Sequence, residues 1–126
     1  MISVIITSRQ EPKTIRKCIS SIADRKYSGI PSPFEIIQVT PDELTLKQGQ
    51  KEANKLGLSK KQYIQIKDPQ KGKPFALKMA IKKAKGDIII FTDGDVYFGK
   101  NSVKELLLPF KRSNVGGVSG RPTSQD

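Results

Sequence analysis

Two aspartates separated by one glycine, Asp93-Gly94-Asp95, are the residues of this 126-residue sequence best suited to chemistry. They follow a short apolar run, residues 88–91, whose β-branched side chains are typical of a strand buried on both faces. Open α/β sheets bind ligands at the edge where their strands end. Two carboxylates this close repel each other unless a cation lies beside them, and Mg²⁺ or Mn²⁺ suits such oxygen ligands. A plain polar turn after the strand is the alternative interpretation.

The composition narrows the function classes. The sequence holds 23 Lys and Arg against 12 Asp and Glu, a net charge of +11, which favours anionic partners such as nucleotides, nucleic acids or an anionic membrane surface. It contains no histidine, so a histidine base or metal ligand is excluded. The single cysteine, Cys18, excludes an internal disulfide, fits a reducing compartment and lies on the apolar face of a predicted helix.

The sequence shows no apolar run of membrane-spanning length and no signal-peptide pattern at its N-terminus. We therefore expect a cytoplasmic protein. Attachment to a membrane is expected only through a further segment of a longer parent, on whose cytoplasmic face this domain would then lie.

Strand and helix patterns alternate along the chain. Apolar runs predict strands at 2–6, 34–39, 63–67, 88–91 and 115–119, and helical spacing predicts helices at 12–23, 44–58, 76–85 and from 101 or 102 to about 109. This alternation implies right-handed crossovers and a single α/β domain over 1–126, with a Rossmann-like, mostly parallel sheet and helices on both faces. The simplest strand order is 3-2-1-4, with the fifth strand beyond it or at an edge.

In that order the winding reverses between the first and fourth strands, and the loops that follow them face each other across a crevice. The residues expected at this edge are polar and follow three different strands. They are Thr7, Arg9 and Glu11 after the first strand, Thr40 after the second, and Asp93 and Asp95 after the fourth. This convergence favours a ligand site over a plain polar turn.

The segments SVIITS, EIIQV, KGKPFALKMAIKKAKGDIIIFTDGDVYFGKN and VGGVSGRP, in this order, resemble the N-terminal half of the inverting nucleotide-sugar glycosyltransferases of family two, which have the GT-A fold. The similarity is greatest to the branch that includes cellulose, chitin and hyaluronan synthases. It implies a nucleotide-sugar donor, expected to be a UDP-sugar, a divalent ion, Mg²⁺ or Mn²⁺, and transfer to an acceptor hydroxyl. By this resemblance Asp95 ligates the metal, Asp93 lies near the ribose, Thr7 contacts the base and Lys73 approaches the nucleotide.

The sequence departs from the family pattern in two places. The family usually has two aspartates after the second strand, the second of which contacts uracil, whereas Thr40 and Pro41 stand here and Asp42 follows. This leaves the identity of the base open. The family's acceptor region and catalytic carboxylate lie beyond the VSGR strand, so neither the acceptor nor a catalytic residue is assigned, and we expect donor binding without efficient transfer.

A GT-A-like sheet normally continues past this point, so the fold is expected to be incomplete. Apolar surface near Val115 and Val118 is then expected to be exposed, with self-association through the fifth strand as one consequence.

Two other functions are compatible with parts of the sequence. The strand followed by DGDVY also resembles haloacid-dehalogenase-type phosphatases, with Asp93 as nucleophile and Asp95 as acid/base, although that motif usually ends the first strand of its domain. Six lysines and no acidic residue lie between Lys71 and Lys85, as in a basic nucleic-acid-binding module. At helical spacing these lysines surround an apolar stripe that is expected to face inward, formed by Leu77, Ala80, Ile81 and Ala84. No base-stacking aromatic residue is expected with them, so we expect no nucleic-acid partner.

Overall fold

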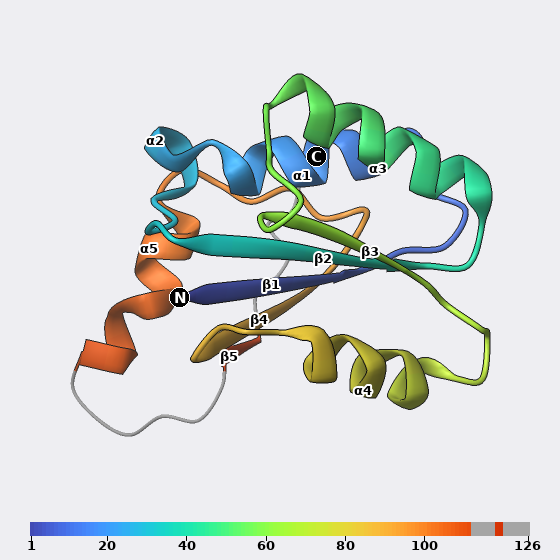
Figure 1. Cartoon of the computed structure of the whole chain (residues 1–126). Coiled ribbons are helices and arrows are strands. Elements are labelled where there is room, and N and C mark those ends of the chain that lie inside the picture. Colours follow the sequence, from blue (N-terminus) through green and yellow to red (C-terminus); the bar gives the residue numbers. More distant parts are fainter. Residues whose placement is uncertain (112–117, 120–126) are drawn as a thin grey trace.

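A parallel five-stranded sheet forms the centre of the molecule (Figure 1). The computed structural model describes residues 1–111 and 118–119. The strand order β3-β2-β1-β4-β5 confirms the predicted arrangement of an α/β, GT-A-like sheet. The strands are β1 (Ile2–Thr7), β2 (Phe34–Thr40), β3 (Tyr63–Lys67), β4 (Ile88–Asp93) and β5 (Val118–Ser119). Positions 115–117 of the predicted fifth strand lie outside the described residues, as do the side chains of Val115 and Val118.

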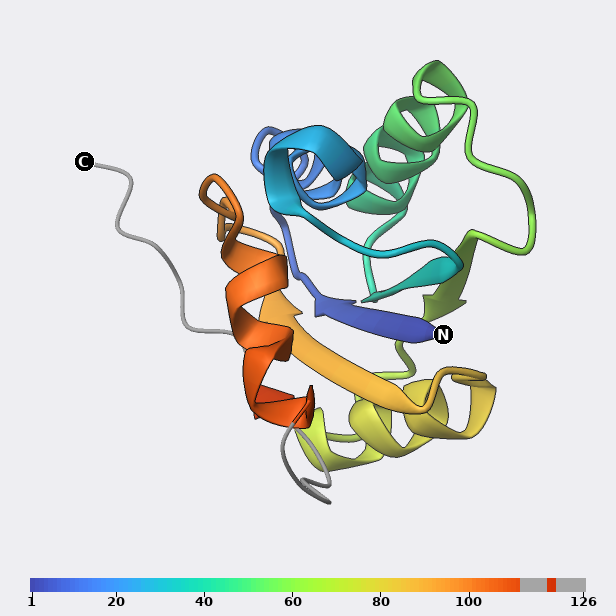
Figure 2. The same ribbon diagram turned by 90° about the vertical axis from the view of Figure 1, so that its left-hand side faces the viewer.

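Helices cover both faces of the sheet, as predicted. Helices α1 and α3 lie on one face and α4 on the other, and the turned view shows the sheet between these two layers with α5 beside β4 (Figure 2). The helices are α1 (Ile15–Ala23), α2 (Arg25–Ser28), α3 (Glu43–Lys55), α4 (Lys73–Lys83) and α5 (Ser102–Leu107), followed by the 3₁₀ helix η1 (Leu108–Lys111).

The helices differ from the predicted ranges mainly at their ends. The helix predicted at 12–23 begins at Ile15, and the helix predicted at 44–58 ends at Lys55. Helix α4 begins at Lys73, three residues before the apolar pattern starts, with Pro74 in its first turn, where proline needs no N–H partner. The short helix α2 was not predicted. Asp24 caps it by accepting a hydrogen bond from the Tyr27 N–H, and Gly29 ends it with a left-handed φ of 75°.

Strand β1 is buried on both faces between two apolar layers. Ile2, Val4 and Ile6 pack with α1, α3 and α5, whereas Ile5 points into the layer beneath α4. Cys18 is fully buried in the layer between the sheet and α1, which confirms its predicted place in the core. This burial raises the pKa of its thiol. Ile81 of α4 was expected to face inward and is instead 44% exposed.

The buried face of α3 is only weakly apolar, since Thr45, Gly49 and Glu52 lie in it. This glycine lies against a buried polar network in which the Tyr63 hydroxyl donates to Gln38 Oε1, and Gln38 Nε2 donates to Thr40 Oγ1 at 2.9 Å. A Cβ atom at position 49 would lie 2.5 Å from the Tyr63 hydroxyl and closer still to Gln38 Oε1. The absence of a side chain therefore allows α3 to pack closely on β2 and β3.

We predict that Gly49→Ala destabilises the protein by about 1–3 kcal/mol, because the methyl group overpacks this network. The sign is diagnostic, since alanine in an ordinary helix interior stabilises by about 1 kcal/mol relative to glycine. Urea denaturation measures the change, with Lys51→Ala on the exposed side of α3 as the control. A gain in stability for Gly49→Ala would contradict the close packing.

Candidate functional site

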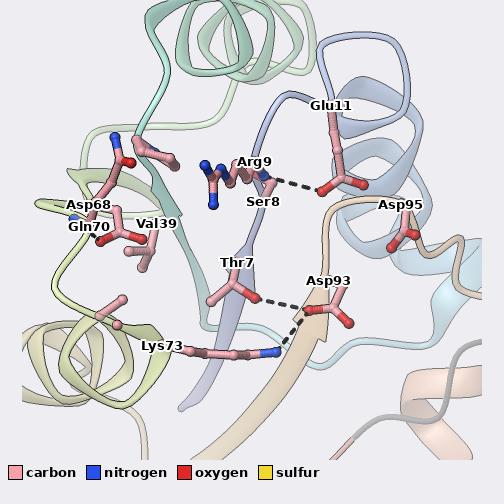
Figure 3. A pocket seen from close by; sticks show the side chains of 13 residues that line it. Thr7, Ser8, Arg9, Glu11, Val39, Asp68, Gln70, Lys73, Asp93 and Asp95 are labelled. Carbon is pink, nitrogen blue, oxygen red and sulfur yellow. Dashed lines mark hydrogen bonds and ion pairs between the residues drawn. The ribbon is translucent and has the colours of Figure 1, made fainter.

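A cavity of about 510 Å³ opens at the carboxyl edge of the sheet, where the predicted site residues were expected to meet (Figure 3). Its walls come from the carboxyl ends of β1, β2 and β4, from the loops after these strands and after β3, and from the first turn of α4. Six of the seven predicted residues line it. They are Thr7, Arg9, Glu11, Lys73, Asp93 and Asp95.

The register of the sheet places Asp93 beside Thr7, the last residue of β1. Thr7 Oγ1 donates to Asp93 Oδ1 at 3.0 Å, and the Lys73 ammonium lies 3.5 Å from the same oxygen. Asp95 is exposed, and within the described part of the chain it forms no ion pair or side-chain hydrogen bond. The two carboxylates therefore differ: Asp93 is oriented by its neighbours, and Asp95 is available to a ligand.

Gly94 between them is required by close packing. Its φ is not in the left-handed region, but a Cβ atom there would lie 2.5 Å from Ser8 Cβ and 3.2 Å from Ile15 Cδ1. The Gly94 N–H donates to the Thr7 carbonyl at 2.9 Å, which extends the contact between β1 and the loop after β4. A side chain at position 94 would push the two carboxylates away from β1.

Thr40 is the predicted residue that does not line the cavity. Thr40 is fully buried. Its hydroxyl is hydrogen-bonded to Ser8 Oγ and accepts a hydrogen bond from Gln38 Nε2. Thr40 therefore holds Ser8 in place and does not face the cavity. Asp42 caps α3 by accepting from the Thr45 N–H at 3.1 Å, and it also accepts from the Gln10 N–H. Burial acts to raise the pKa of Asp42, but the hydrogen bonds from Thr45 and Gln10 outweigh it and hold that pKa below its usual value.

Asp68 and Gln70 line the cavity and were not among the predicted site residues. Asp68 directly follows β3; its N–H donates to the Thr40 carbonyl, and its Oδ1 accepts from the Gln70 N–H at 2.8 Å. Figure 3 shows Asp68 and Gln70 on the opposite side of Arg9 from Glu11 and Asp95. A polar residue directly after the third strand was the available signal, since the same signal identified Thr7 and Asp93.

The end of the cavity beside the Asp-Gly-Asp loop is strongly anionic. Burial raises the pKa of Glu11; the hydrogen bond from the Arg9 N–H opposes this, and the charges of Asp95 and Asp93 add to it. Among the described residues no group of three or more His, Cys, Asp or Glu side chains could hold a metal ion alone. Asp93 and Asp95 supply oxygen ligands only, which fits an ion that takes its remaining ligands from phosphate groups and water.

Comparison with known proteins identifies the family. The model of "Glycosyl transferase family 2" matches residues 3–126. The chain belongs to glycosyl transferase family 2. This membership decides against the phosphatase interpretation, and the position of Asp93 at the end of the fourth strand agrees with it.

Relatives in this family transfer N-acetylglucosamine. The chain is 30% identical over 119 residues to an N-acetylglucosaminyltransferase of Azorhizobium caulinodans, covering 94% of this chain and 29% of the relative. It is 27% identical over 128 residues to the poly(ribitol-phosphate) beta-N-acetylglucosaminyltransferase TarS of Staphylococcus aureus, covering 92% of this chain and 22% of TarS. The chain thus spans less than a third of the length of these two relatives.

Solved structures give the same fold. The structure of S. aureus TarS 1–349 in complex with UDP-GlcNAc has a TM-score of 0.68 at 27% identity, covering 98% of this chain and 37% of TarS 1–349. A longer TarS structure gives 0.67. In the part of the chain that the structure describes, no helix is both long enough and apolar enough to cross a membrane.

We predict that Glu11→Gln stabilises the ligand-free protein at neutral pH. A raised pKa means that the ionised carboxylate is disfavoured in the folded state, so the neutral amide removes a destabilising charge. The gain should shrink as the pH falls through the raised pKa of Glu11, where the wild-type carboxyl takes up a proton. Melting temperatures between pH 4 and pH 8 measure this, with Glu105→Gln, at an exposed carboxylate outside the cavity, as the control. A gain independent of pH would contradict the electrostatic origin.

Proposed function

We propose that this chain binds a UDP-sugar, of the UDP-GlcNAc class, and supplies the donor-binding part of a sugar transfer to an acceptor hydroxyl. The observation that carries the proposal is the cavity itself, which has the carboxylates of Glu11, Asp93 and Asp95 with Lys73 at one end and Asp68 and Gln70 at the other. The Arg9 side chain lies between the two ends (Figure 3). A nucleoside diphosphate sugar has the same division into a charged diphosphate and a base with polar edges. The TarS complex with UDP-GlcNAc supports this choice of donor.

The diphosphate belongs at the Asp-Gly-Asp end. Asp95, with Asp93, would hold a Mg²⁺ or Mn²⁺ ion, which when bound neutralises the charge that develops on the leaving diphosphate. Thr7 orients Asp93 through its 3.0 Å hydrogen bond. The exposed Lys73 ammonium adds a positive charge on the same side and needs to move little from Asp93 to meet a phosphate oxygen.

The base belongs at the Asp68 end. Uracil presents one N–H donor between two carbonyl oxygens, and the Asp68 carboxylate is an acceptor suited to that donor. The planar Arg9 guanidinium can stack on the ring. Asp68 would thus take over the contact that family members make through an aspartate after the second strand, where this chain has Pro41.

We assign donor binding, and not the complete reaction, to this chain. Inversion at the sugar also needs a carboxylate that removes the acceptor proton, and the chain spans only part of its relatives. The segment KGKPFALK supports a place in the branch of cellulose, chitin and hyaluronan synthases, and the acceptor stays unassigned.

We predict that UDP-GlcNAc with Mn²⁺ raises the melting temperature of the protein, because a ligand that binds the folded state stabilises that state. At a hundredfold excess of ligand over Kd, the free energy of unfolding rises by about 2.7 kcal/mol. Asp95→Asn should remove the metal-dependent part of the shift while the protein stays folded. Asp87→Asn is the matched control, since Asp87 is exposed at the opposite edge of the sheet. The proposal fails if neither metal with any nucleoside diphosphate sugar shifts the transition.

A second prediction concerns the base. Asp68→Asn should lower the preference for UDP over CDP by about tenfold, because a hydrogen bond to a charged group contributes roughly 1.5–3 kcal/mol and an amide can also donate to cytosine. Isothermal titration of both nucleotides with Mn²⁺ measures the ratio. Asp87→Asn, the same change of carboxylate to amide at an exposed residue outside the cavity, is the control. An unchanged ratio would remove Asp68 from base recognition.

A further inference from the structure

The side of α4 that faces away from the sheet carries a cationic surface with an aromatic centre. Ala76 and Ala80 are buried against the sheet, whereas Phe75, Lys78 and Lys82 are exposed and recur at helical spacing on the opposite side. Lys71, just before the helix, places its ammonium 5.3 Å from the centre of the Phe75 ring. We call the four residues Lys71, Phe75, Lys78 and Lys82 the α4 stripe.

The positive charge of this surface is uncompensated. Besides the stripe lysines, Lys73, Lys83 and Lys85 belong to the same segment, and no acidic residue occurs between Asp68 and Asp87. Within the described residues, Lys73 is the member of this group with an ion-pair partner, Asp93. A segment with so many lysines and no neighbouring acid attracts anionic surfaces.

Two apolar side chains are exposed within the same surface. Phe75 is 41% exposed and Ile81 44% exposed. From the sequence we expected no aromatic residue beside these lysines, and we expected Ile81 to lie in the core; both expectations were wrong. Because the small Ala76 and Ala80 occupy the contact with the sheet, both larger side chains are instead directed to solvent.

We propose that the α4 stripe docks on the surface of an anionic lipid bilayer. The lysines pair with phosphate headgroups, and Phe75 and Ile81 enter the boundary between headgroups and acyl chains. The exposed apolar side chains favour a bilayer over a nucleic acid, since a phosphate backbone leaves them in water. The segment also contains no arginine for bidentate contacts to phosphates or bases.

Docking of this kind would hold the donor cavity near the membrane. Lys73 and Ala76 line that cavity from the same helix that carries the stripe. The cavity and the stripe therefore share the N-terminal part of this helix, and Lys71 of the stripe lies between Gln70 and Gly72, which line the cavity. Docking of the α4 stripe does not depend on which donor the cavity binds, so the stripe can fail to bind membranes while the proposed donor binding holds.

The chain contains no tryptophan, which allows a site-specific optical probe. The Phe75→Trp variant should show a blue-shifted emission on vesicles of phosphatidylserine and phosphatidylcholine, and no shift on phosphatidylcholine alone. Leu44→Trp is the matched control, because Leu44 is an exposed apolar residue of α3 on the other face of the sheet. An equal shift at position 44, or no shift at position 75, overturns the proposal.

Charge removal provides the second test. Lys71, Lys78 and Lys82, the three lysines of the stripe, changed together to Gln should lower the partition onto anionic vesicles by tenfold or more, since each lysine near such a surface contributes about a factor of five. Lys47, Lys51 and Lys55, changed together to Gln, remove the same charge from the exposed side of α3 and should change the partition by less than about twofold, because they lie off the docking face. Glutamine preserves helix propensity in both variants.

The two triple variants and Phe75→Ala, compared by co-sedimentation at several salt concentrations, distinguish docking on a bilayer from attraction by net charge alone and from binding of a soluble polyanion. Equal losses in the two triple variants would show that only the net charge attracts the chain, which overturns the proposal. Tighter binding to single-stranded DNA or inorganic polyphosphate than to vesicles, unaffected by Phe75→Ala, would overturn it in favour of a soluble polyanion. Loss confined to the α4 stripe variant and to Phe75→Ala supports docking on the bilayer.

Discussion

The parallel pairing of β1 with β2 on one side and β4 on the other is the constraint on which the rest of the structure depends. The register sets Thr7 beside both Val39 and Asp93. Because all the strands run in the same direction, the residues that follow them emerge at one edge and form the cavity there. The apolar residues of β1 that allow this pairing are buried on both faces, so the chain has little freedom to shift the register.

A buried polar network stiffens the floor of this edge. Tyr63, Gln38, Thr40 and Ser8 are linked by successive hydrogen bonds from β3 through β2 to the loop after β1. Such a network is stabilising when its members are satisfied, and it specifies one arrangement of the strands. Gly94 then packs directly on Ser8. The position of the Asp-Gly-Asp loop is therefore set from beneath by side chains that touch no ligand.

The two sides of helix α4 differ in the size and charge of their side chains. Its small inner residues allow it to lie close to the sheet, which brings Lys73 of its first turn within 3.5 Å of Asp93. Its outer side holds lysines and two apolar residues that the sheet has no room for. The arrangement of Lys73 in the cavity and the α4 stripe thus both depend on the packing of one helix.

The sequence by itself determined the strand order, the α/β class and the place of Thr7, Asp93 and Asp95 at one edge, because apolar periodicity and the ends of parallel strands are local signals. It also indicated the family through the order of four segments along the chain. Only the tertiary structure decided that Thr40 is buried beneath the cavity, that Asp68 lines it, and that Ile81 is exposed. The positions of these three residues depend on contacts between segments that are distant in sequence and on the size of the side chains packed against them. A local sequence pattern does not encode such contacts.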